Sequence, residues 1–361
     1  MTLVSIVGRD SREGRLSMVC HLPLHLIKDI TTCLCNLWWL VMLVRTSAVH
    51  ELASSFSRLH QLPRLKTIDL RFYSGYNKRI DSDEGRVGLQ ASILGALTTS
   101  FSIRTPPDLI SLSLHNLRAW DLSPLASPPF QTVLPALRHL QLSVLLPNHP
   151  DPVYWHYFWS ILYPNMILAP AQHALTELIL HTDTYIGASC GLSFDALHFP
   201  HLCMLSLRKL VFEPSVGIES FVLRHAATLT RLFLFTCKLP GSPDEMLSSW
   251  ILSSSTVLAR DEESSSRLGG WDQIWDRFAE GLTSLIGLHV DERRDSWNPV
   301  DRYVFSEPER MTYWEFGIES RNTADTEALR RFYMTVSARR RRAGYPEGEA
   351  ALQSYWGDGE W

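Results

Sequence analysis

The stretch "AATLTRLFLFTCKL", residues 226–239, decides how the rest of the chain is interpreted. Its spaced apolar residues, Leu229, Leu232, Leu234, Cys237 and Leu239, are separated by 3, 2, 3 and 2 positions. Neither the 3.6-residue period of a helix nor the plain alternation of a strand gives this series. A turn that enters a short strand does, because two residues that are two apart point to the same face of the strand.

The same pattern of apolar residues at i, i+3 and i+5 recurs along the chain. Nine units begin at Leu37, Leu65, Leu109, Leu137, Leu175, Leu202, Leu229, Leu285 and Met311. The distances between their starts are 28, 44, 28, 38, 27, 27, 56 and 26 residues, so five of eight lie between 26 and 28. Self-similarity of this kind predicts an α/β fold, an irregular leucine-rich-repeat solenoid with short parallel strands and helical crossovers.

The segments between the units favour helical crossovers. Residues 217–229 and 326–342 each place apolar side chains on one face of a helix. Those side chains are Phe221, Val222, His225, Ala226 and Leu229 in the first segment, and Leu329, Phe332, Tyr333 and Val336 in the second. The second helix is expected to cap the C-terminal end of the solenoid, since a terminal unit needs a polar outer face.

We call the series of repeat units the ladder. Three insertions interrupt it, at 76–104, 147–172 and 240–281. The first contains a helix-like segment, and the third is a polar run with the composition of a loop. In the aromatic second insertion, helical periodicity predicts a buried stripe of Tyr154, Phe158 and Leu162. Trp155 and Trp159 fall on a second face, where core packing is favoured over a role at an interface.

Composition limits the class of protein. The 361 residues are 45% hydrophobic and 20% charged, with a net charge of -4, which argues against a general nucleic-acid binder. Six cysteines are too few for a disulfide scaffold, which favours a reducing compartment, cytoplasmic or nuclear. The most apolar run, 30–44, has 15 residues, and a membrane span needs about 20, so no membrane role is expected.

One region resembles a known family. "FPHLCMLSLRKLVF" at 199–212, followed by "IESFVLRHAATLTRLFLFTCKL" at 218–239, is similar to the repeat region of fungal F-box/leucine-rich-repeat proteins. The matching residues are Phe199, Pro200, Glu219, Phe221, His225, Thr228, Leu229 and Cys237. The resemblance implies that the repeats hold a target protein and that an N-terminal F-box docks the adaptor of a cullin ubiquitin ligase.

The segment "LPLHLIKDITTCL", 22–34, is the candidate F-box. Its opening fits, but the following "CNLWWLVMLV" lacks the loop acids and the second helix of an F-box. Leu37 is also in register with the ladder, so a repeat strand, an F-box and another helix all remain open for this region. The predicted organisation is an N-terminal helical cap or degenerate F-box at 1–36, the solenoid at 37–320, and a capping helix with a tail at 321–361.

Chemical motifs are weak. "GASCG", 187–191, matches a nucleophile elbow with Ser189 as nucleophile, but a loop between repeats explains it better. Cys20, His21, His25, Cys33 and Cys35 do not have the spacing of a zinc finger, so no metal is expected. The run "RRRR", 339–342, fits the C-terminal end of a helix better than a localisation signal. No glycine-rich nucleotide motif is present, and no cofactor is expected.

Strand alternation places certain side chains between the core leucines, on the concave face. They are Arg71, His115, Gln141, His181, Arg208, Arg231, Phe233, Phe235, His289, Asp291 and Glu315. Histidine, arginine and exposed phenylalanine favour a protein target with some acidic character. The sequence therefore predicts a non-enzymatic interaction module that resembles the substrate receptor of a cullin-type ubiquitin ligase. The alternatives are a repeat scaffold without a ubiquitin role and, more distantly, a serine hydrolase that uses Ser189.

Overall fold

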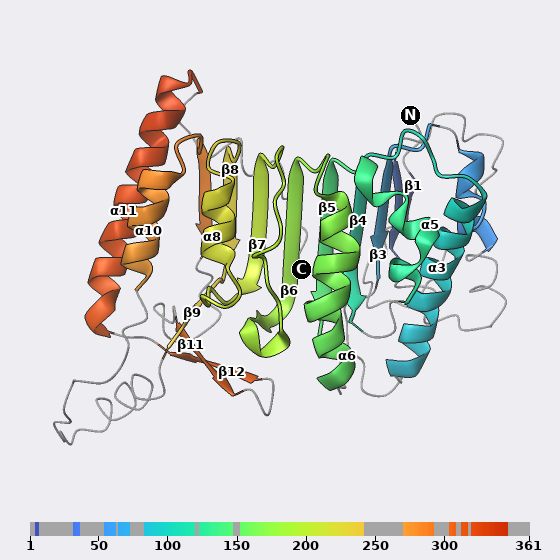
Figure 1. Cartoon of the computed structure of the whole chain (residues 1–361), viewed down its shortest axis with the longest axis horizontal. Coiled ribbons are helices and arrows are strands. Elements are labelled where there is room, and N and C mark those ends of the chain that lie inside the picture. Colours follow the sequence, from blue (N-terminus) through green and yellow to red (C-terminus); the bar gives the residue numbers. More distant parts are fainter. Residues whose placement is uncertain are drawn as a thin grey trace, which may run out of the picture.

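Nine strands form one open sheet in which every neighbouring pair is parallel (Figure 1). The computed structural model describes residues 4–6, 32–36, 54–62, 64–72, 83–119, 123–146, 152–241, 270–291, 303–307, 312–316 and 319–345. The sheet order is β1 (Val4–Ile6), β2 (Thr32–Asn36), β3 (Thr67–Arg71), β4 (Ser111–Arg118), β5 (His139–Leu145), β6 (Glu177–Ile186), β7 (Met204–Leu210), β8 (Arg231–Phe235) and β10 (Gly287–Asp291). The predicted α/β fold with parallel strands is confirmed.

The leucine pattern marks where seven of these strands begin. If the first leucine of a unit is position 1, the strands β3 to β8 and β10 all begin at position 3. Position 4 of each unit pairs with position 4 of the next, as in Leu112 with Leu140 and Leu205 with Leu232, and position 6 pairs with position 6 in the same way. These side chains point to one face, where Leu112, Leu205 and Leu232 are fully buried. The prediction that the leucines stack on successive parallel strands is confirmed.

Backbone bonds repeat at the turn into each strand. At position 2, each amide donates to the position 2 carbonyl of the preceding unit: Thr176 to Arg138 at 2.8 Å, Cys203 to Thr176 at 2.9 Å and Thr230 to Cys203 at 2.9 Å. The Thr176 and Thr230 hydroxyls donate to the same carbonyls, both at 2.9 Å. A threonine at position 2 therefore adds a second hydrogen bond to the carbonyl that already accepts its backbone amide.

The turn out of the strand also repeats. Position 8 has a left-handed backbone in three units, at Asn116, Lys209 and Thr236, with φ of 58°, 57° and 48°. Non-glycine residues adopt this conformation infrequently. At position 9, the Cys237 thiol lies 3.6 Å from the Leu207 carbonyl oxygen of the preceding unit.

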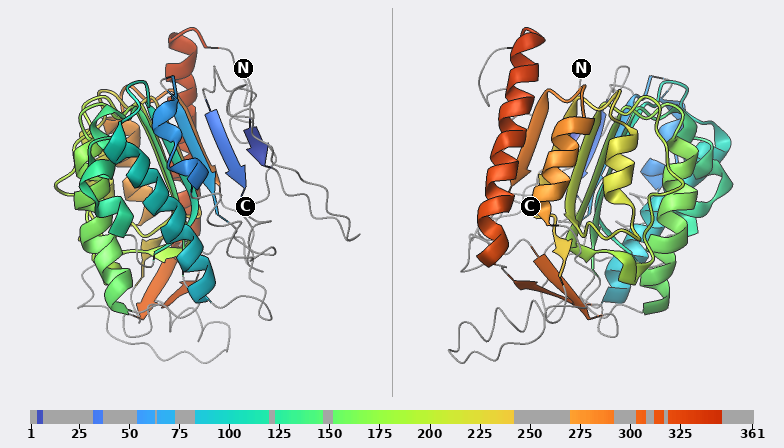
Figure 2. Two further views of the ribbon diagram at one scale, coloured as in Figure 1. Left: turned by 90° about the vertical axis from the view of Figure 1, so that its right-hand side faces the viewer. Right: turned by 60° about the vertical axis from the view of Figure 1, so that its left-hand side comes forward.

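The described helices α3, α6, α8 and α10 cover the leucine-bearing face of the sheet and leave the opposite face without a helix (Figure 2). We call the opposite face the open face. The α-helices are α3 (Asp83–Ile103), α4 (Ser123–Ala126), α5 (Pro128–Gln131), α6 (Pro152–Tyr157), α7 (Ala169–Ala171), α8 (Ile218–Arg224), α10 (Trp271–Gly281) and α11 (Glu319–Arg342). The shorter turns are the 3₁₀ segments η2 (Leu59–Gln61), η3 (Leu134–Ala136) and η5 (Ala188–Cys190).

The aromatic insertion corrects one detail of the sequence prediction. Trp155 and Trp159 are buried in the main core, as predicted, whereas Tyr154 is 50% exposed and was wrongly placed in the buried stripe. The helix continues as the π-helix η4 (Phe158–Leu168). A π-helix has a wider turn than an α-helix, so the 3.6-residue period does not describe which side chains share its inner face.

A second, three-stranded sheet lies at the carboxyl ends of β7 and β8 (Figure 1). It contains β9 (Leu239–Pro240), β11 (Tyr303–Glu307) and β12 (Thr312–Phe316), with β11 and β12 antiparallel. The prediction that Met311 starts a ninth unit of the ladder is therefore wrong. The alternating apolar residues after Met311 do predict a strand, but alternation alone does not say which strand becomes its neighbour.

Polar contacts join the C-terminal helix α11 to α10. The Asp325 carboxylate accepts a bond from the Asp272 amide at the start of α10 (3.0 Å) and one from the Tyr303 hydroxyl (2.8 Å). Arg339 donates to the Ala279 and Leu282 carbonyls at the other end of α10. One member of the arginine run thus caps a neighbouring helix rather than its own.

The apolar face predicted for 326–342 is confirmed in its main members. Leu329, Phe332 and Val336 are buried, and Tyr333 is partly buried against the core.

Only strands are described within the N-terminal unit predicted at 1–36. β2 pairs with β3 through Thr32 and Thr67, so part of the candidate F-box segment is a strand. The strand predicted from Leu37 lies outside the described residues, as do Cys20, His21 and His25. Among the described helices, none combines the length and apolar character needed to cross a bilayer.

Candidate protein-interaction surface on the open face

The open face is formed by positions 3, 5 and 7 of the seven units. Strand register aligns positions 3 and 5 across the sheet, and it aligns position 7 except between β4 and β5, where the register shifts after Leu114; the result is three rows of side chains. Position 3 contributes Thr67, Ser111, His139, Glu177, Met204, Arg231 and Gly287; position 5 contributes Asp69, Ser113, Gln141, Ile179, Ser206, Phe233 and His289; position 7 contributes Arg71, His115, Ser143, His181, Arg208 and Phe235.

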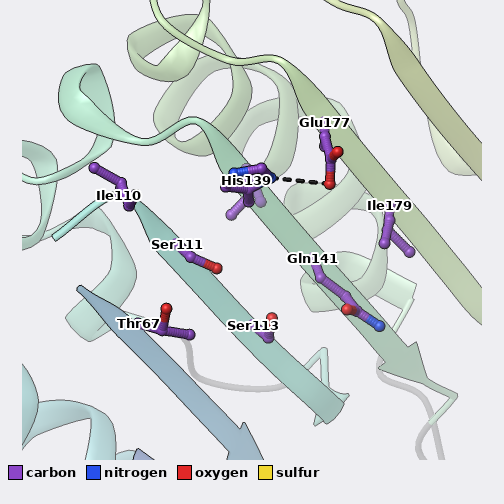
Figure 3. Close-up of a pocket in the computed structure, with 9 residues that line it drawn as sticks. Thr67, Ile110, Ser111, Ser113, His139, Gln141, Glu177 and Ile179 are labelled. Carbon is purple, nitrogen blue, oxygen red and sulfur yellow. Dashed lines mark ion pairs between the residues drawn. The ribbon is translucent and has the colours of Figure 1, made fainter. Parts of the chain in front are cut away.

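A pocket of about 350 Å³ opens on this face over β3 to β6 (Figure 3). Six of its nine lining residues carry a hydroxyl, imidazole, amide or carboxylate group, and the other three are aliphatic. The lining residues are Thr67, Ile110, Ser111, Ser113, His139, Leu140, Gln141, Glu177 and Ile179. We call this the hydroxyl pocket.

An ion-pair network fixes one wall of the hydroxyl pocket. His139 Nδ1 lies 2.9 Å from Glu177 Oε2, and Arg231 Nη2 lies 2.7 Å from Glu177 Oε1 (Figure 3 shows the first contact). Burial alone would raise the pKa of Glu177, but the hydrogen bond and charge of His139 and the charge of Arg231 outweigh it and lower that pKa. Glu177 is therefore ionised at neutral pH, and each of its oxygens already faces a donor.

An aromatic cluster lies beside the pocket, over the neighbouring strands β6, β7, β8 and β10. Phe233 and Phe235 stack with ring centres 6.4 Å apart, and the His289 ring lies 5.3 Å from Phe235. Phe233 packs with Ile179 and Met204 in a small cluster separate from the main core, with Phe235 against it. Ile179 belongs to both the pocket and this cluster, so the two features are continuous.

Two buried histidines occupy position 7. His181 is 5% exposed, and its Nε2 lies 3.0 Å from the Ser206 hydroxyl. Burial, followed by the charges of Arg208 and His115, lowers the pKa of His181 to about 3, so this ring is neutral at physiological pH.

The second buried histidine, His115, contacts a carboxylate. Its Nε2 lies 3.2 Å from Asp69 Oδ1, and Arg71 lies 3.3 Å from the other oxygen of Asp69. Burial raises the pKa of Asp69, but the hydrogen bond from His115 and the charges of both neighbours lower it overall. The arginines at 71 and 231 thus have carboxylate partners within this face.

The structure brings most of the predicted partner-binding residues onto one face but corrects their exposure. Arg71 is exposed, and the half-buried group comprises Gln141, Arg208, Arg231, Phe235 and His289. His115, His181 and Phe233 are buried, so the expectation of an exposed phenylalanine is wrong at Phe233, and the two histidines present little surface to a partner.

The last two predicted residues differ from the rest. Asp291 pairs with Phe235 at the end of β10. Glu315 lies on β12, paired with Val304 in the small sheet, and so does not belong to the open face. It was included because its unit was assigned to the ladder.

Sequence reasoning missed most of the hydroxyl pocket. Thr67, Ser111, Ser113, His139 and Glu177 were not selected, although all lie at positions 3 or 5. A signal for them existed, because listing positions 3, 5 and 7 of every unit recovers the complete face. The prediction took position 7 from nearly every unit but took positions 3 and 5 from only a few.

The catalytic alternative gains no support from the described geometry. Ser189 lies in the 3₁₀ turn η5, with its hydroxyl 3.8 Å from the Cys190 thiol, whereas a nucleophile elbow requires an α-helix after the strand. Ser111, His139 and Glu177 align across three strands, but among the described residues no hydrogen bond joins the Ser111 hydroxyl to His139. Within the described ranges, no three His, Cys, Asp or Glu side chains are grouped to hold a metal ion.

Comparisons with known proteins do not assign a function to the chain. No protein-family model, curated protein or solved structure matches the chain.

Proposed function

We propose that this chain is a non-enzymatic protein-interaction module, an irregular leucine-rich-repeat solenoid whose open face binds a protein target. The observation that carries the proposal is the contrast between the two faces of the sheet. One face is covered by helices and lined by leucine, while the other carries three rows of mixed polar and aromatic side chains with a pocket among them.

The chemistry of the open face agrees with a protein partner. Aromatic and arginine side chains are the residue types most enriched at energetically important interface positions. Phe235, Arg208 and Arg71 supply them here in half-buried or exposed positions. The half-buried amide of Gln141 adds a group that both donates and accepts hydrogen bonds.

The ubiquitin-ligase role rests on the family resemblance. It requires that the adaptor of a cullin ligase binds through residues 1–36, of which the structure describes only β1 and β2. The alternative is a repeat scaffold with no ubiquitin role. Co-purification separates them: a substrate receptor recovers the adaptor with the full chain and loses it when 1–36 are deleted, with the circular dichroism spectrum as the control for folding.

The interaction itself is tested by a matched pair of substitutions. Gln141→Arg places a long charged side chain on the open face, and Gln273→Arg places the same side chain at an exposed position of helix α10. Affinity purification with mass spectrometry is compared for the wild type and both variants. We expect Gln141→Arg to lose a specific partner at least tenfold, while Gln273→Arg retains it and both melt near the wild type.

Equal recovery of every partner by both variants would contradict the proposal. Arg231→Glu and Phe233→Ala are less suitable tests than they seem from the sequence. Arg231 is bonded to Glu177, and Phe233 is buried, so either substitution also disturbs the folded sheet.

A further inference from the structure

The hydroxyl pocket contains a set of hydrogen-bonding side chains that the fold itself does not use. Within the described part of the chain, the Thr67, Ser111, Ser113 and Gln141 side chains make no hydrogen bond to another residue. They come from three neighbouring strands and line one volume (Figure 3). A folded chain usually satisfies its half-buried polar groups internally or with solvent, so four in one concavity can serve a ligand.

His139 adds a fifth group with a defined orientation. Its Nδ1 faces Glu177 at 2.9 Å, so in the neutral ring Nδ1 carries the hydrogen and donates it to the carboxylate. Nε2 is on the other side of the ring. The His139 side chain is 41% exposed, so Nε2 can meet a ligand without a change in the fold.

The charges around the pocket nearly cancel, so the pocket has no net attraction for a cation. Both oxygens of Glu177 already face donors, and this side chain is only 13% exposed. Arg231 is positively charged and lies beyond that carboxylate. The charges of Glu177 and Arg231 therefore nearly cancel at the pocket. A carboxylate entering the pocket would meet three hydroxyls and one amide N–H that can donate, and a His139 imidazolium would add its Nε2–H as a charge-assisted donor.

We propose that the hydroxyl pocket binds the carboxylate of an aspartate or glutamate side chain from the protein partner. The inference rests on the proposed function, because it assigns the chemistry of one contact on the same open face. The pocket volume of about 350 Å³ holds one or two side chains and is at the low end for a separate small-molecule site. The rest of the partner then lies along the open face toward the aromatic cluster.

The test uses three blocked pentapeptides, acetyl-Gly-Gly-X-Gly-Gly-amide, with X as Glu, Gln or Lys. Binding to the full chain is followed by amide chemical shifts and by the imidazole resonances of His139. We expect the Glu peptide to bind with a millimolar dissociation constant and to shift the His139 resonances. The Gln and Lys peptides are expected to bind about tenfold more weakly, since they lack the charge-assisted bonds.

Two matched histidine variants locate the site. His139→Gln removes the imidazole that lines the pocket, and His173→Gln changes an exposed histidine outside the pocket. His139→Gln is expected to weaken the Glu peptide about tenfold, and His173→Gln is expected to leave it unchanged. The remaining histidine resonances report that both variants are folded.

Three outcomes would overturn the carboxylate assignment: equal or tighter binding of the Lys peptide, equal binding of the Gln peptide, or no response of the pocket to any of them. The proposed function would fail differently. It fails if Gln141→Arg retains every partner, whereas a partner that is lost with Gln141→Arg but no peptide response at His139 rejects the carboxylate site alone.

Discussion

The two faces of the same parallel sheet follow opposite rules. Across the core face, position 4 is almost constant, as Leu112, Leu140, Leu178, Leu205 and Leu232 pair in an unbroken row. Across the open face, the adjacent position 5 changes character at nearly every strand. Packing against neighbouring units restricts the first row to side chains of one size, whereas the second row mixes buried side chains such as Ser206 and Phe233 with half-buried ones such as Gln141.

The largest expected effect is a break in the core row. Leu205→Ala removes a fully buried side chain between two paired leucines and leaves a cavity that the neighbouring units cannot fill. We expect a loss of about 3–5 kcal/mol in the free energy of unfolding, measured by urea titration. A loss below about 1 kcal/mol would mean that the leucine row does not form the core.

Much of the core face was predictable from the sequence, and the reason is physical. A leucine at position 1 followed by a pair at 4 and 6 specifies a turn, a strand and its inward face at once. The start of β4 two residues after Leu109 was therefore readable, as was its neighbour β5 after Leu137. Met311 shows the limit, because a strand pattern does not encode which partner it pairs with.

The open face was less predictable because burial there depends on contacts between units. His181 and Arg71 occupy the same position 7, yet one is buried and the other is exposed. Whether a side chain is covered depends on its neighbours, such as Ser206 beside His181, and no periodicity in a single unit records them. The residues of the hydroxyl pocket could be listed from positions 3 and 5, but their meeting in one pocket could not be predicted, since the pocket exists only when four strands are aligned.

Phe233 tests the difference between the two faces, because it lies on the open face but is as buried as a core residue. It is 2% exposed and packs with Ile179 and Met204. We expect Phe233→Ala to cost about 2–3 kcal/mol in urea titration, less than Leu205→Ala, because a small cluster outside the main core can collapse more fully around the gap. A cost near zero would return Phe233 to the set of exposed binding residues.

The stability of the open face should depend on pH, whereas the stability of the core face should not, because the core face is lined by leucine. The pKa of His181 is about 3 in the folded chain and about 6.5 in the unfolded chain, so below pH 6.5 the unfolded state binds the extra proton. Stability from this group is complete above pH 6.5 and declines as the pH falls toward 3. Between pH 7.5 and 5, we expect the wild type to lose about 1–2 kcal/mol more than His181→Gln.

The control for that measurement is His173→Gln, which changes an exposed histidine. Its stability should depend on pH as the wild type does. If His181→Gln and His173→Gln give the same pH profile, His181 does not titrate as a buried neutral ring.

The smallest expected effect is also the most diagnostic of function. Gln141 lies in the second row of the open face, directly between Ser113 and Ile179, and its amide makes no hydrogen bond within the described chain. Gln141→Ala should therefore change the free energy of unfolding by less than about 0.5 kcal/mol in the same urea titration. A loss of more than about 1 kcal/mol would show that the amide supports the fold. If stability is unchanged while a partner is lost, Gln141 is retained for recognition, because neither packing nor hydrogen bonding within the sheet requires an amide there.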